Sequence, residues 1–228
     1  MARPAAPRTK RAPAKASATS DPEPAAPQKT SRRSKRAIIM RTAVKHFGTD
    51  GYDETKWAEV AIEVGLGGTA LYHYFESKQH CLFEIMADAL ASYREAFAAA
   101  TGAHDEYLPG LRAALRSGFA LDDYEILRMR VLVDKQGSIG GKSSTPREEE
   151  SRLRARNNIR GLEMDWAAYL ARGVAGGLIP NNDMRLLARA VLAMNTSVWQ
   201  WYRPDGAIPL SEVADFYVGK QLAIIGID

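Results

Sequence analysis

The sequence predicts an all-α protein, in which a small N-terminal helical unit is followed by a larger helical domain. From about residue 31 onward, apolar residues recur at spacings of three and four, the period of a helix with one buried face. Between residues 55 and 78, a break with three glycines separates two short helical patterns. With 228 residues, of which 46% are hydrophobic, the chain is long enough for both units.

The first 30 residues are rich in Ala, Pro, Lys, Arg and Ser and contain almost no large apolar side chains. Such a segment cannot bury enough surface to offset its ordering entropy, so we expect a disordered basic tail. Residues 1–36 carry a net charge of +8, and the rest of the chain carries −4. This asymmetry favours contact with a polyanion such as DNA over the alternative, a solvated tail that only aids solubility.

Residues 31–76 are predicted to form three helices. The first ends near Gly48, and its inward face holds Ile39, Met40, Ala43, Val44 and Phe47. Thr55 is expected to be the N-cap of the second helix, whose inward face holds Ala58, Ala61 and Ile62. After Gly65 a short third helix starts at Gly67 or Gly68 and reaches about His73, with Leu71, Tyr74 and Phe75 inward.

Two helices joined by a tight, glycine-bearing turn form a helix-turn-helix, which places its second helix in a DNA major groove. The predicted third helix, residues 67–75, is therefore the candidate recognition helix.

Residues 77–228 are predicted to form the larger domain. Ser77 caps a helix over roughly residues 78–100, and two more amphipathic helices follow between 102 and 134, with Leu108 in the apolar stripe of the first. Residues 135–146 are rich in Gly and Ser and predict a mobile loop. A long helix, roughly Arg147 to Val174, follows with Leu153 on its inward face.

The last two helical patterns are a candidate dimer surface, because their stripes suit packing along another helix. An intramolecular core has the same spacing, so the pattern alone does not separate the two interpretations. The residues concerned are Leu187, Val191, Met194, Val198, Trp201, Val213, Phe216 and Tyr217.

Enzyme and metal functions are not favoured by the sequence. No Ser-His-Asp arrangement, phosphate-binding glycine loop or paired-carboxylate motif occurs in a recognisable context, so no cofactor is expected. His73, His80 and Cys81 lack further ligands for a tetrahedral metal site. The single cysteine fits a reducing compartment, and neither a spanning helix nor a secretory signal is evident, so we expect a cytoplasmic protein.

Residues 36–82 resemble the DNA-binding domain of the tetracycline-repressor (TetR) family of bacterial regulators. The resemblance rests on FGTDGY from Phe47, on Thr55, on Val60-Ala61, and on VGLGGTALYHYFESKQHCL from Val64. It implies a homodimer formed by the last two helices, bound to a palindromic double-stranded operator.

The resemblance also implies roles for individual residues. The Thr55 position caps the second helix beside a phosphate, Thr69, Tyr72 and His73 face bases and phosphates, and Lys78 contacts a phosphate. Where the family commonly has Ser or Thr, then Lys, then Gly, this chain has Gly67, Gly68 and Thr69, so the backbone N–H groups there are left to hold the phosphate. The candidate DNA contacts are Arg33, Lys35, Thr55, Lys56, Gly67, Gly68, Thr69, Tyr72, His73 and Lys78.

A second, shorter match covers Trp201-Tyr202-Arg203-Pro204-Asp205-Gly206. It is similar to a signature in a TetR branch that governs fatty-acid or sterol breakdown, several members of which respond to acyl-CoA thioesters. An aromatic group in the larger domain is either core or the wall of an apolar ligand pocket. The candidate effector residues are Met129, Trp166, Tyr169, Trp199 and Arg160, and Arg128, Arg130 and Arg172 are further candidates for phosphate contacts.

The function expected from these observations is sequence-specific control of transcription, as a repressor released by a small hydrophobic or acyl-CoA effector. The alternatives are a nonspecific architectural DNA-binding protein and an activator without a small-molecule ligand.

Overall fold

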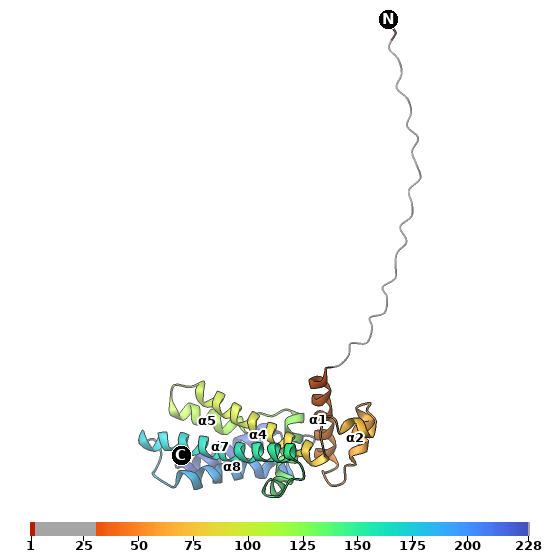
Figure 1. The fold of residues 1–228 in the computed structure, drawn as a ribbon. Helices are drawn as coiled ribbons and strands as arrows, with labels where there is room; N and C mark the ends of the chain where they lie inside the picture. Colours follow the sequence, from red (N-terminus) through yellow and green to blue (C-terminus); the bar gives the residue numbers. More distant parts are fainter. Residues whose placement is uncertain (3–30, 228) are drawn as a thin grey trace. The chain divides into compact units, whose positions relative to one another are not determined.

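The computed structural model describes residues 1–2 and 31–227, so the predicted basic tail, apart from its first two residues, lies outside the described part. Within residues 31–227 the chain forms α-helices and one short 3₁₀ helix, as the sequence predicts (Figure 1). The helices are α1 (Arg32–Thr49), α2 (Trp57–Glu63), α3 (Gly68–Leu71), α4 (Lys78–Gly102), α5 (Tyr107–Ser117), α6 (Asp123–Asp134), η1 (Gln136–Gly140), α7 (Pro146–Ala175), α8 (Met184–Trp201) and α9 (Leu210–Ile225).

Helices α1, α2 and α3 surround a small aromatic core that belongs to the helix-turn-helix. The ring of Phe47 in α1 lies between those of Tyr52 and Trp57, with distances of 5.0 Å and 6.4 Å between ring centroids. The ring of Trp57 in turn packs edge-on against Phe75. Trp57 is therefore a core residue. Aromatic rings of this size contribute much of the apolar area that a small domain can bury.

The predicted inward face of α2 is wrong in two of its three residues. Ala58 and Ile62 are exposed, Ile62 at 74%, whereas Val60, Ala61 and Val64 are buried beside Trp57. The error arose because Trp57 was left out of the pattern: the stripe that starts at Trp57 continues at Val60, Ala61 and Val64, which is the helical period.

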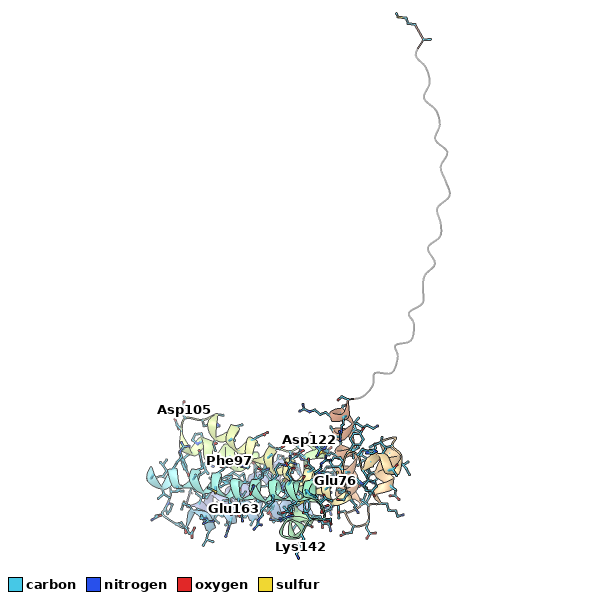
Figure 2. The ribbon with its side chains drawn as sticks, viewed as in Figure 1. Glu76, Phe97, Asp105, Asp122, Lys142 and Glu163 are labelled. Atoms are coloured by element: carbon cyan, nitrogen blue, oxygen red, sulfur yellow. The ribbon has the colours of Figure 1, made fainter. Side chains whose placement is uncertain are left out.

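Helix α4 is the central element of the structure, and the predicted helix over 78–100 is confirmed. The Ser77 side chain accepts a hydrogen bond from the His80 N–H at 2.8 Å, as a helix N-cap does. Helix α4 packs against α7 over much of its length and also meets α5 and α6 (Figure 1). Figure 2 shows Glu76 at the end of this bundle next to α1 and Asp105 at the opposite end. Because α4 starts in the helix-turn-helix region and ends in the bundle, it connects the two mechanically.

Two predicted details of α5 to α7 are corrected. Leu108 and Leu153 are exposed and do not belong to the apolar faces of α5 and α7. The segment 135–146 is not a plain loop, because it contains η1, whose Ile139 is buried and accepts a hydrogen bond from Arg152 at 2.6 Å through its carbonyl. The boundary between the predicted domains 31–76 and 77–228 remains a prediction.

Candidate DNA interface and effector cavity

The turn that aims the recognition helix is built on Gly65, whose φ is +67°. Its N–H donates to the Ile62 carbonyl at 3.0 Å, and the Leu66 N–H donates to the Ala61 carbonyl at 2.8 Å. These two bonds form a Schellman motif, in which a left-handed residue, usually glycine, ends a helix. The motif ends α2 and lets α3 begin three residues later.

The face of α3 that points away from the core holds the predicted base contacts. Leu71 and Phe75 are buried, whereas Thr69, Tyr72 and His73 are exposed, Tyr72 at 53%. The helix itself is shorter than predicted, because after Leu71 the chain continues as a turn. Gly67 and Gly68 are also exposed, and no side chain caps the helix start. A hydroxyl, a phenol and an imidazole are thus available to a ligand on this face.

Two basic candidates are exposed on the surface. Arg33 of α1 is exposed, and so is Lys56 at the N-cap of α2. The ammonium of Lys56 is 3.5 Å from the Glu59 carboxylate, an exposed pair that contributes little to stability. Both cations remain candidate phosphate contacts.

Three other candidates bind the protein's own backbone. The Thr55 side chain is buried and its hydroxyl donates to the Gly51 carbonyl at 2.8 Å, so it does not cap α2, whose N-cap is Lys56. Lys35 donates to the Val64 carbonyl at 2.6 Å at the end of α2. Lys78 donates to the Thr55 carbonyl at 2.6 Å, and burial lowers its pKa. These side chains fix the helix-turn-helix and satisfy helix-end and loop carbonyls, which the spacing of the sequence did not indicate.

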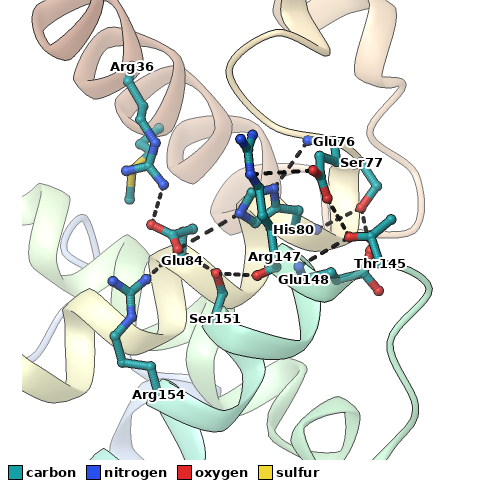
Figure 3. Close-up of polar contacts among 11 residues, drawn as sticks. Arg36, Glu76, Ser77, His80, Glu84, Thr145, Arg147, Glu148, Ser151 and Arg154 are labelled. Carbon is teal, nitrogen blue, oxygen red and sulfur yellow. Dashed lines mark hydrogen bonds and ion pairs between the residues drawn. The ribbon is translucent and has the colours of Figure 1, made fainter.

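A polar cluster joins the helix-turn-helix to the bundle (Figure 3). Its centre is the buried carboxylate of Glu84 on α4, which accepts hydrogen bonds from Arg36 of α1 and from Ser151 and Arg154 of α7. Burial alone would raise the pKa of Glu84, but the hydrogen bonds from Arg36 and Ser151 outweigh it and hold the pKa below its usual value. The Glu84 carboxylate thereby links α4 to both α1 and α7.

His80 lies beside this carboxylate and is held neutral. The Glu76 N–H donates to its Nδ1 at 3.1 Å, which leaves the proton on Nε2, and the ring packs edge-on against Phe75 at 5.6 Å. Burial lowers the pKa of His80, although the carboxylates of Glu84 and Glu76 act in the opposite direction. Protonation of Nδ1 would also break the hydrogen bond from Glu76.

We predict that His80 makes folding stability depend on pH just below neutrality. A histidine in the unfolded chain has a pKa of about 6.5, and the pKa of His80 in the folded protein is lower. The unfolded state therefore binds more protons, so folding stability falls as the pH drops from about 7. His80→Gln should flatten this part of the curve in urea unfolding at a series of pH values. The exposed His104→Gln is the control, and identical slopes for wild type and His80→Gln would contradict the prediction.

Neither Glu84 nor Arg154 was predicted as a functional residue. Glu84 lies within the apolar run of residues 81–86, and Arg154 is exposed on α7. The only available signal was a carboxylate inside a stripe of core positions, which is rare without a partner.

A cavity of about 250 Å³ lies between α4, α6, α7 and α8. Its walls are mainly apolar and include Leu90, Met129, Leu132, Leu162 and Leu192. On its polar side the Arg189 guanidinium is 3.2 Å from the Glu163 carboxylate, and both side chains are partly exposed.

The five predicted effector residues do not share this cavity, although Met129 lines it. Trp166 is fully buried against Phe97, at 4.7 Å between ring centroids, and is a core residue. Tyr169 donates to the Tyr107 carbonyl at 3.1 Å and lines a separate groove between α4 and α7. Trp199 lines a third cleft, and Arg160 is an exposed surface residue. Helical spacing places residues on a face but does not say which faces enclose the same space.

The predicted dimer residues divide into buried and exposed ones. Leu187, Val191, Val198 and Val213 are buried in the protomer's own core, so their stripe packs inward and is not available to a partner. A chain of polar contacts joins α9, α8 and α4: the Gln221 amide donates to the Asn195 side-chain oxygen at 2.7 Å, and the Asn195 amide donates to the Tyr93 hydroxyl.

Trp201 and Phe216 are exposed, and Met194 and Tyr217 are partly buried. Further exposed apolar side chains on or between α8 and α9 are Leu186, Ile208 and Ile224. Of the predicted dimer residues, Trp201 and Phe216 are therefore the two with exposed side chains, and they remain candidates for contact with a second copy.

Across residues 1–2 and 31–227, no helix is long and apolar enough to cross a membrane. In the same residues, no three His, Cys, Asp or Glu side chains gather in a group that could hold a metal ion.

Two protein-family models match the chain. Residues 39–85 match the model described as bacterial regulatory proteins, tetR family, and residues 125–225 match a tetracyclin repressor-like C-terminal domain. The chain belongs to the TetR family. Members of this family are transcriptional regulators that bind DNA operators and are not enzymes, so this protein is a DNA-binding regulator with a helix-turn-helix.

Individual relatives of this TetR-family protein are distant but cover most of it. The transcriptional repressor KstR2 of Mycolicibacterium smegmatis is 23% identical over 196 residues, which are 83% of this chain and 89% of KstR2. The structure of KstR2 of Mycobacterium tuberculosis, a ketosteroid transcriptional regulator, is similar with a TM-score of 0.71, at 20% identity, covering 86% of this chain and 96% of that one. AibR, solved with isovaleryl coenzyme A and operator DNA, is similar with a TM-score of 0.69, at 21% identity, covering 82% and 97%.

Proposed function

We propose that this TetR-family protein is a cytoplasmic repressor, which binds a palindromic operator as a homodimer and is released by an acyl-CoA or similar hydrophobic effector. The observation that carries the DNA part is the exposed face of Thr69, Tyr72 and His73 on a helix held by the Schellman turn. The effector part is supported by the apolar cavity between α4, α6, α7 and α8 and by the likeness to AibR and KstR2.

The proposed mechanism uses the two α3 helices of a dimer. They would enter successive major grooves, which lie roughly 34–36 Å apart. An effector that binds better to a dimer with another spacing of these helices must weaken operator binding to the same extent. A coupling of about 1–3 kcal/mol corresponds to a 5–150-fold loss of operator affinity.

The size of the cavity limits which part of an effector it encloses. Pockets that enclose a whole drug-sized ligand measure ~300–1,000 Å³, whereas this cavity measures about 250 Å³. We therefore propose that it takes an apolar acyl group, while a polar carrier such as CoA lies outside, on the side of Arg189 and Glu163.

The decisive experiment is operator selection from random DNA, followed by binding titrations with a panel of acyl-CoAs. A repressor of the proposed kind enriches an inverted repeat and loses affinity for it when one acyl-CoA is added. Enrichment of no sequence would favour a nonspecific architectural protein. A specific operator that no acyl-CoA affects, with transcription raised by the protein, would favour an activator.

We predict that Leu192→Trp abolishes the effector response and leaves operator affinity unchanged. The larger ring fills the cavity that Leu192 lines, whereas the face of α3 is untouched. Leu178→Trp, at an exposed leucine that does not line the cavity, is the matched control. An unchanged effector response in Leu192→Trp would mean that the effector binds elsewhere.

We predict that Phe216→Glu shifts the dimer strongly towards monomer. The ring is 62% exposed in the single chain, and burying a carboxylate against a second copy costs several kcal/mol. Sedimentation equilibrium should give a dissociation constant at least ~100-fold higher than that of wild type, which corresponds to about 2.7 kcal/mol. Ile62→Glu places the same charge on α2 and should leave the dimer intact. If both variants stay dimeric, the interface lies on another surface.

A further inference from the structure

A cleft of about 350 Å³ opens where α1, α4 and the first turns of α7 meet, next to the polar cluster of Figure 3. Four arginines line it: Arg32 and Arg36 from α1, and Arg147 and Arg154 from α7. Two carboxylates, Glu84 and Glu150, also line it, so the lining carries an excess of two positive charges when His80 is neutral.

The positive charge is exposed, and the carboxylate at the centre is not. The Arg36 and Arg154 side chains are 35% and 50% exposed, whereas the Glu84 side chain that they share is 7% exposed. Solvent in the cleft therefore meets guanidinium groups before it meets Glu84. The acidic groups nearby are Glu150 and Asp88, which are exposed, and Glu76, which is partly buried and lies 3.6 Å from Arg147. The carboxylate of Asp88 interacts electrostatically with Arg36 and Arg154. When Glu76 and Asp88 are counted as well, four carboxylates balance the four arginines, so binding of an anion depends on the exposed guanidinium groups and not on a net charge of the region.

The guanidinium groups also have donors to spare. Each carries five N–H donors. The described contacts of Arg32 are one bond to the His73 carbonyl at 3.0 Å, and those of Arg154 are its pair with Glu84. One positive charge is enough to neutralise the Glu84 carboxylate, whereas Arg36 and Arg154 bring two. Planar forks of this kind match the oxygens of a phosphate in bidentate geometry.

We propose that this cleft binds a phosphate group through Arg32, Arg36, Arg147 and Arg154, and that the bound anion holds the helix-turn-helix against α7. The phosphate can come from the DNA backbone beside the recognition helix, because Arg32 donates a hydrogen bond to the His73 carbonyl just after that helix. It can also come from a soluble phosphate-bearing molecule. In either case the anion joins α1 to α7, so its occupancy biases the position of the recognition helix. This inference goes beyond the proposed function, because the cleft is separate from both the face of α3 and the apolar cavity.

The test uses the full-length protein and has two arms, with Arg154→Gln as the main variant. In the first arm, inorganic pyrophosphate is titrated without DNA by calorimetry. In the second, operator affinity is measured across salt concentrations. Arg156→Gln is the matched control, because it removes the same charge from the same helix but does not line the cleft. Arg147→Gln, at a 63% exposed side chain, is a second variant in case Arg154→Gln does not fold.

If the ligand is a soluble molecule, pyrophosphate should bind to wild type and to Arg156→Gln with similar affinity. It should bind at least ~10-fold more weakly to Arg154→Gln. A DNA phosphate predicts that the salt slope of operator binding falls by about one in Arg154→Gln and not in Arg156→Gln. The proposal is overturned if the two variants behave alike in both arms. Because the first arm contains no DNA and no acyl-CoA, its outcome is independent of the proposed repressor function.

Discussion

Operator binding is expected to fall about 5–150-fold when Tyr72 is replaced by alanine, which corresponds to the ~1–3 kcal/mol of a good base contact. Tyr72 follows α3 on the exposed face, with more than half of its surface available to DNA. Because the side chain is not part of the core, the variant should keep its unfolding midpoint and its dimer. A gel-shift titration with the selected operator measures the effect.

Tyr72→Phe separates the two parts of this contact. If the hydroxyl binds a phosphate or base edge, the phenylalanine variant loses most of the affinity; if the ring packs on a thymine methyl, it retains most of it. Unchanged affinity in Tyr72→Ala would refute the placement of the recognition helix, since Thr69 and His73 belong to the same face.

The largest loss of stability is expected for Trp166→Ala. The ring is fully buried on α7 and packs against Phe97 of α4, so its removal opens a cavity between the two helices that pack most extensively. Truncations of this kind cost about 3–5 kcal/mol. For a chain of this length, each kcal/mol of lost stability lowers the unfolding midpoint by about 2–4 °C. A thermal scan should therefore show a midpoint that is lower by roughly 6–20 °C.

Met164→Ala is the matched control for Trp166→Ala, because Met164 lies two residues away on the same helix and is mostly exposed. It should change the midpoint by no more than a degree or two. The Trp166 indole N–H has no acceptor among the described residues, so alanine leaves no acceptor without its donor, and the loss is one of packing alone. Equal midpoints for the two variants would mean that Trp166 is not in the core.

Local signals in the sequence were sufficient for the α-helices and for some of their ends. Ser77 was predicted as the cap of α4, and its side chain accepts the bond that a cap requires. The glycines near residue 65 predicted the turn of the helix-turn-helix, and Gly65 takes the left-handed conformation that ends α2. Such signals act over a few residues, so they can be recognised without knowledge of the rest of the fold.

The roles of several single residues were predicted wrongly, because those roles depend on distant neighbours. Thr55 has the chemistry of an N-cap, but its hydroxyl is used by the Gly51 carbonyl. The stripe of Leu187, Val191 and Val198 has the spacing of a dimer surface, but it packs into the protomer's own core. A periodic pattern defines a buried face and does not identify what buries it.

The amino-acid sequence by itself determined the helical class, the helix-turn-helix and the exposed face of its recognition segment, because helical periodicity and capping are local properties. Only the tertiary structure decided which helices enclose the apolar cavity, which apolar residues remain exposed on α8 and α9, and that Arg36 and Arg154 share the carboxylate of Glu84. Those features join residues up to 118 positions apart along the chain, and only the packing of α4 against its neighbours brings them together.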